Sequence, residues 1–81
     1  MRIKAKDLEL LNRLIIMKGF SKVEFSKAIG MSQPMTIQIT NGDRSPSPKT
    51  AKKIADVLER EWNDIFEFER SERSVKQAIN D

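Results

Sequence analysis

Apolar side chains recur every three or four positions along most of the chain, which is the spacing of amphipathic α-helices. Residues 5–18 carry one such stripe. Residues 47–59 carry another, which begins at the Ser47-Pro48 pair, a capping residue followed by proline at the first helical position. A short helix or turn at residues 62–66 buries three large apolar groups. The pattern therefore predicts an all-α fold.

The first stripe is wider than one helix face, because Leu10, Ile16 and Met17 add apolar groups beside it. This surplus either packs under a neighbouring helix or forms a surface for a partner. Residues 1–4 precede the stripe and are expected to be a frayed start or an arm.

The centre of the chain predicts two short helices joined by a tight turn. Ser21 and Glu24 make a capping box, in which each side chain accepts a hydrogen bond from the other residue's amide. This helix should end near Gly30, because glycine readily takes the left-handed conformation that closes a helix. Ser32 is a second N-cap candidate, and a helix over residues 33–40 follows it.

Residues 35–40 also fit a strand, because they alternate apolar and polar and lead into the turn pair Asn41-Gly42. The following segment contains Pro46 and Pro48, which lack the amide donors of a returning strand. We therefore predict a helix. Two helices joined by a three- to four-residue turn form a helix-turn-helix, whose second helix can enter the major groove of DNA.

Composition excludes several classes of protein. With 81 residues, 38% of them hydrophobic and 33% charged, the chain is expected to fold as one small globular domain. It has no Cys, His or Tyr and no phosphate-binding glycine loop, so we expect neither an enzyme nor a bound metal or cofactor. The longest apolar run, residues 14–17, is too short to span a membrane. These features favour a cytoplasmic protein.

Charge is distributed unevenly along the chain. Residues 1–60 carry 12 Lys and Arg against 6 Asp and Glu, a net charge of +6, whereas residues 61–81 carry 3 against 6, a net charge of −3. A basic body favours a polyanion such as DNA, and an acidic end favours a position away from it. An ordinary solvated surface explains the same asymmetry.

Residues 8–66 resemble the phage-repressor-like (Cro/repressor, XRE-type) helix-turn-helix family. The resemblance rests on Gly19-Phe20-Ser21, Phe25, Ser26, Ile29-Gly30-Met31-Ser32, Ile39, Asn41-Gly42, Pro46-Ser47, Ile54-Ala55, Leu58 and Ile65-Phe66. It implies a compact five-helix DNA-binding domain over residues 1–66. Residues 67–81 would then be a polar C-terminal extension, either a tail or a short sixth helix that could serve dimerisation.

The resemblance also implies which residues meet DNA. The base-contacting positions of the family correspond here to Gln33, Pro34, Ile37 and Gln38. The phosphate-contacting positions correspond to Lys22, Ser32, Asn41 and Arg44. Glutamine suits adenine, because its amide can pair bidentately with the N6 and N7 edge of that base.

Several positions depart from the family pattern. The family commonly pairs an arginine with a glutamate where this chain has Ile15 and Thr40, and Thr36 stands where an apolar core residue is usual. Residues 31–43 contain no Lys or Arg, which leaves the expected DNA-reading helix without cations.

Two functions follow as hypotheses. The first is a sequence-specific transcriptional regulator, such as a phage or prophage repressor, that binds an inverted-repeat DNA operator as a homodimer. The second is an antirepressor or modulator on the same fold. It would bind a partner repressor protein through an apolar surface at Met35 and Ile37.

Overall fold

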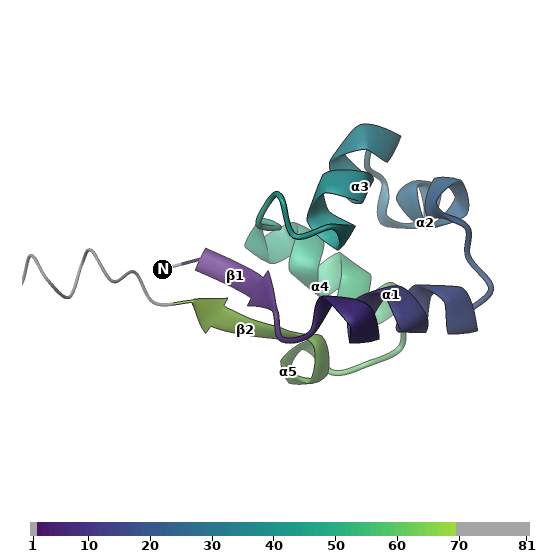
Figure 1. Ribbon diagram of the computed structural model, residues 1–81. Helices are drawn as coiled ribbons and strands as arrows, with labels where there is room; N and C mark the ends of the chain where they lie inside the picture. Colours follow the sequence, from purple (N-terminus) through teal and green to yellow (C-terminus); the bar gives the residue numbers. More distant parts are fainter. Residues whose placement is uncertain (1, 70–81) are drawn as a thin grey trace, which may run out of the picture.

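The computed structural model describes residues 2–69, in which five helices lie between two short strands in the sequence (Figure 1). The elements are β1 (Arg2–Ala5), α1 (Leu8–Met17), α2 (Lys22–Ile29), α3 (Gln33–Thr40), α4 (Pro48–Val57), α5 (Trp62–Ile65) and β2 (Phe66–Glu69). The predicted helical fold is confirmed. Residues 33–40 form a helix, so the alternative interpretation of this segment as a strand is wrong.

Local capping explains where the central helices begin and end. The Ser21 hydroxyl accepts a hydrogen bond from the Glu24 amide at 3.1 Å, and the Glu24 carboxylate accepts one from the Ser21 amide at 2.9 Å. Gly30 closes α2 with a φ of 70°, a left-handed conformation that suits glycine. The other capping side chains are Asp7 for α1, Ser32 for α3 and Ser47 for α4.

The core lies where all the elements meet. Phe25, Leu11 and Ile54 are each 0% exposed and come from three different helices, so α1, α2 and α4 share one hydrophobic cluster. Ile65 and Phe66 close this cluster as predicted, whereas Trp62, the third apolar group of residues 62–66, is only partly buried against it. The remaining buried apolar residues are Ile3, Leu14, Ile15, Ile29, Ile39, Ala51, Ala55 and Leu58.

The two ends of the described chain pair as an antiparallel ribbon (Figure 1). Ile3 lies opposite Phe68 and Ala5 opposite Phe66, and Ile3 is buried against the core. The expectation of a frayed start at residues 1–4 is therefore wrong for residues 2–4.

The ribbon also changes the interpretation of the chain's C-terminal part. Strand β2 crosses the boundary that we predicted after residue 66, and residues 67–69 belong to a strand instead of a tail or a helix. The rest of the predicted extension, residues 70–81, lies outside the described residues.

The surplus apolar side chains of α1 face solvent. Ile16 and Met17 are 70% and 74% exposed, and Leu10 is 37% exposed. The prediction that they pack under a neighbouring helix is wrong, and a partner surface stays a prediction. Among the described helices, none combines the length and hydrophobicity that a membrane crossing requires.

Candidate nucleic-acid interface

Helices α2 and α3 form the helix-turn-helix, and they lie beside each other at one edge of the molecule (Figure 1). Ser26 on α2 is 4% exposed, and its hydroxyl donates to the carbonyl of Lys22 at 2.6 Å, so this small buried polar side chain is satisfied within its own helix. Met31, in the turn, packs against the core. Met31 thus anchors the turn between α2 and α3 on the core.

The outward face of α3 carries the predicted base-contacting residues. Gln33, Pro34 and Gln38 are exposed, and Ile37 is 37% exposed. The opposite face is anchored by Thr36 and Ile39, which are 0% and 4% exposed. The helix therefore presents two amide side chains to solvent on a buried support.

Met35 and Ile37 do not form one exposed apolar surface. Met35 is only partly exposed and packs against the core, whereas Ile37 faces outward. Partner binding at Met35 and Ile37 stays a prediction, and Ile37 is the more exposed of the two side chains.

Gln38 and Arg44 are joined by a hydrogen bond. The Arg44 Nε donates to the Gln38 Oε1 at 3.0 Å, and both side chains are exposed. This contact connects a predicted base-contacting residue with a predicted phosphate-contacting one in the loop after α3. Because Oε1 accepts from Arg44, the two amide protons of Gln38 stay available for an acceptor outside the protein.

Lys22 points toward the end of α3. Its ammonium donates to the Thr40 hydroxyl at 2.9 Å in a partly buried contact. The Thr40 hydroxyl in turn donates to backbone carbonyls of its own helix, 3.0 Å from Thr36 O and 3.2 Å from Ile37 O. For Lys22 to contact a phosphate, its ammonium would have to exchange Thr40 for the DNA.

Thr40 and Ile15 are both buried, at 1% exposure each, where the family commonly has an ion pair. The hydrogen bond from Lys22 supplies a positive charge to this region from another helix. A cation beside the C-terminal end of α3 interacts favourably with the negative end of the helix dipole. The contact therefore cross-links α2 to α3.

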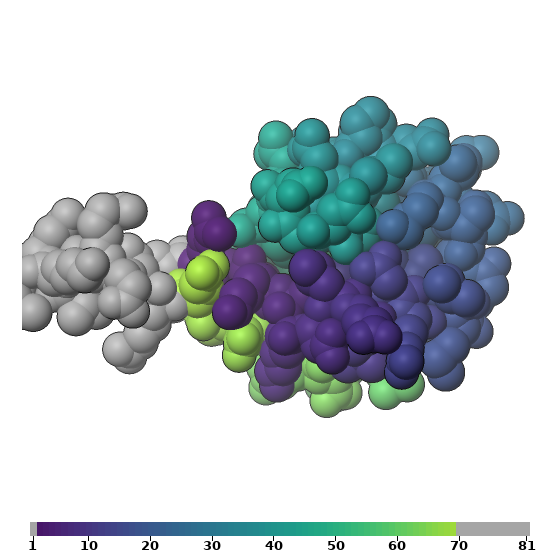
Figure 2. All heavy atoms as spheres, in the orientation of Figure 1, coloured from purple at the N-terminus to yellow at the C-terminus, as the bar shows by residue number. Residues whose placement is uncertain are grey.

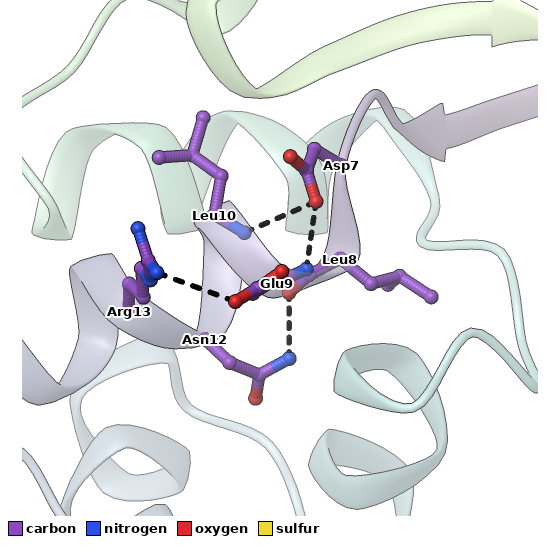
Figure 3. Close-up of polar contacts among 6 residues, drawn as sticks. All are labelled: Asp7, Leu8, Glu9, Leu10, Asn12 and Arg13. Carbon is purple, nitrogen blue, oxygen red and sulfur yellow. Dashed lines mark hydrogen bonds and ion pairs between the residues drawn. The ribbon is translucent and has the colours of Figure 1, made fainter.

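Asn12 is a positioning residue that sequence reasoning missed. Its Nδ2 donates to Leu8 O at 2.8 Å within α1 and to Thr40 O at 3.0 Å at the last residue of α3. Figure 3 shows Asn12 reaching back to Leu8 at the start of α1, beside the Asp7 cap and the ion pair of Glu9 with Arg13. The only sign of this role in the sequence was that Asn12 is a polar residue beside the apolar stripe of residues 5–18.

The other predicted phosphate-contacting residues lie at the two ends of α3. The Ser32 hydroxyl accepts from the Met35 amide at 3.3 Å and so caps the helix. Asn41 follows the last turn, and its side chain is exposed. Ser32 and Asn41 thus flank the exposed face of α3 at its two ends, and their contact with phosphates stays a prediction.

The charges of this face lie at its edges. Residues 31–43 carry one charged side chain, that of Asp43, so α3 itself is neutral.

At the start of α2, the hydrogen bonds from the Ser21 amide and hydroxyl lower the pKa of Glu24 below its ordinary value of 4.5. Glu24 is therefore ionised at neutral pH and strengthens the helix start.

Comparison with known proteins agrees with this geometry. A family model described as helix-turn-helix matches residues 11–65. A protein of Bacillus subtilis (strain 168), named uncharacterized HTH-type transcriptional regulator YqaF, is 38% identical over 50 residues. That similarity covers 62% of this chain and 66% of the Bacillus protein, just under two thirds of its length.

Proposed function

Because the chain belongs to the helix-turn-helix family, which matches it over residues 11–65, we propose that it is a DNA-binding transcriptional regulator. In this proposal α3 lies in the major groove and α2 lies across the sugar-phosphate backbone. The name of the Bacillus relative, an HTH-type transcriptional regulator, supports the same activity.

The observation that carries the proposal is the outward face of α3. Gln33 and Gln38 are exposed on a helix whose opposite face is buried, which supports the proposal that their amides meet base edges. A glutamine can pair bidentately with adenine, and each good pair of this kind is worth about 1–3 kcal/mol of discrimination. Pro34 and Ile37 complete this face and suit apolar contact with thymine methyl groups.

The phosphate contacts of the proposal flank that face. Ser32 and Asn41 lie at the two ends of α3, and Arg44 lies in the loop that follows it. Lys22 contributes after its ammonium leaves Thr40. Contacts of this kind fix the register of the protein on the duplex and carry no base preference of their own.

We further propose that the regulator acts as a dimer on an inverted repeat, as a repressor or Cro-like protein of phage type. Two α3 helices would then enter successive major grooves ~34 Å apart. If each subunit neutralises two or three phosphates, the logarithm of the affinity should fall with the logarithm of salt concentration with a slope of roughly −4 to −5.

The test is selection of bound sequences from a random DNA pool at a stated salt concentration, with stoichiometry measured on the selected duplex. We expect enrichment of a two-fold repeat bound by two chains. A pool that stays unenriched at low salt would contradict DNA reading, and one chain per site would contradict the dimer.

The exposed Ile37 and the uncharged α3 favour one second candidate, an antirepressor that binds a partner repressor protein. In that case Ile37→Asp should abolish association with the repressor. The matched control, Val23→Asp, changes a side chain that is 42% exposed on α2 and should leave association unchanged. A DNA site protected by the purified protein alone would count against this candidate.

A further inference from the structure

A hollow of about 350 Å³ lies beside the loop that follows α3. Its walls come from β1, from the start of α1 and from that loop, which Figure 2 shows next to one another as the purple and teal residues. Four basic residues and one acidic residue are among those that line it, namely Arg2, Lys4, Lys6, Arg44 and Glu69, and most of the others are apolar, including Ile3, Leu8, Leu11, Ile39 and Phe66. The charged residues around the hollow are therefore mostly basic.

Two of these cations are paired and two are not. The Arg2 Nε lies 2.9 Å from Glu69 Oε1, and the Lys4 Nζ lies 3.6 Å from Glu67 Oε2. Among residues 2–69, Lys6 and Arg44 form no ion pair with a carboxylate. Lys6 and Arg44 can therefore meet an anion without breaking an ion pair of the described chain.

Arg44 connects this hollow to the face that we propose reads DNA. It lines the hollow, and its Nε donates to Gln38 on α3. A group seated in the hollow would therefore lie just beyond the C-terminal end of α3, where the DNA backbone leaves the major groove.

We propose that this hollow binds a phosphate of the DNA backbone, next to the base pairs that α3 contacts. The assignment rests on the proposed function and adds the strand β1 to the DNA-binding surface. Lys6 and Arg44 donate hydrogen bonds to the phosphate oxygens without giving up an ion pair of the described chain. Charge-assisted hydrogen bonds of this kind are strong. Arg2 joins them by exchanging Glu69 for the phosphate, since exposed ion pairs are worth only about 0–1 kcal/mol.

The first variant is Lys6→Ala, and its matched control is Arg60→Ala. Arg60 is exposed in the turn between α4 and α5, which lies on the other side of the molecule from α3 (Figure 1). Lys6→Ala keeps the backbone hydrogen bond from residue 6 to Ile65 O, so the ribbon should stay folded, which a thermal melt checks.

We expect Lys6→Ala to weaken binding to the selected and random duplexes by the same factor, roughly five- to tenfold at 0.1 M salt, and to flatten the salt slope by about 0.9 per bound subunit. The loss of Arg60 should change neither quantity appreciably, because charges about 10 Å or more from DNA are screened at that salt concentration. Equal behaviour of the two variants would overturn the assignment.

The second variant acts in the opposite direction. Glu69→Gln removes the carboxylate of the hollow and releases Arg2, so affinity for both duplexes should rise and the salt slope should steepen. The backbone pairing of residue 69 with Arg2 does not involve the carboxylate. A folded Glu69→Gln protein that binds DNA no more tightly than the wild type would overturn the assignment.

A last experiment tests whether the hollow binds the DNA backbone or only free phosphate. Inorganic phosphate is titrated into the protein without DNA, and the amide resonances of β1 are followed. Saturable shifts at β1 together with unchanged DNA binding by Lys6→Ala would mean that the hollow takes free phosphate only, which overturns the inference. Failure of the wild type to bind any duplex would instead overturn the proposed function.

Discussion

Asn12 holds the C-terminal end of α3 against α1, and its removal should loosen the reading helix. Its Nδ2 lies 3.0 Å from Thr40 O and 2.8 Å from Leu8 O. The Asn12→Ala change leaves Leu8 O with its ordinary partner inside the helix, the amide of residue 12. Thr40 O, one of the four C-terminal carbonyls that a helix cannot satisfy itself, loses the side-chain donor.

The magnitude follows from these two effects. An unsatisfied buried polar group costs about 1–3 kcal/mol, and this contact is only partly buried, which places the loss in the lower half of that range. Alanine regains up to about 0.7 kcal/mol of helix propensity. The net fall in the free energy of unfolding should be about 1 kcal/mol, or roughly 4–8 °C in the melting temperature of a domain of this size.

The assay is a thermal melt followed by circular dichroism, with Asn63→Ala as the control. Asn63 is exposed in α5, and the same substitution there removes no side-chain hydrogen bond found among the described residues. We expect a lower melting temperature for Asn12→Ala only. Indistinguishable melts for the two variants would refute the reasoning that Asn12 fastens α3.

Two further predictions concern α2. Gly30→Ala should lower the free energy of unfolding by about 1–2 kcal/mol, because φ is 70° there and an alanine is strained in this left-handed conformation. No neighbouring atom lies within 4 Å of the added Cβ, so the whole cost is backbone strain. Urea denaturation checks this, and an alanine variant as stable as the wild type would contradict it. The lowered pKa of Glu24 stabilises the fold above its ordinary value of 4.5, and that stability should be lost as the pH falls through the folded-state pKa. Glu24→Gln keeps a capping acceptor without this titration, so its melting temperature should depend less on pH below 4.5, and identical pH profiles would refute the assignment.

The helices could be predicted because their signals are local. The capping box of Ser21 and Glu24 and the glycine that ends α2 lie within ten residues, and the structure has them as predicted. The proline and serine signals before α4 act over the same short range. Periodicity and caps thus defined the helix-turn-helix, whereas the outward positions of Gln33 and Gln38 were implied by the family resemblance.

The ribbon was missed because its signal is distant in sequence. Arg2 and Glu69 pair across almost the whole described chain, and each strand is only four residues long. The complementary patterns were present, with basic residues alternating with apolar ones in β1 and acidic residues alternating with apolar ones in β2. Such patterns become informative only when the two segments are known to meet.

The contacts around α3 were missed for a related reason. Asn12, Lys22 and Thr40 come from three helices, and hydrogen bonds between helices leave no periodic signature in the sequence. The same holds for the hydrogen bond between Arg44 and Gln38, which spans a loop. The resemblance implied which side chains would face DNA, whereas only the structure shows which of them make hydrogen bonds with other side chains.

The most direct test of base reading by α3 is the affinity of Gln33→Ala for the selected duplex and for random DNA, measured in the same salt. Gln33 is exposed and makes no side-chain hydrogen bond within residues 2–69, so its loss should leave the fold unchanged. We predict a loss of ~1–3 kcal/mol on the selected duplex and almost none on random DNA. An equal loss on both duplexes, or no loss on either, would contradict the account.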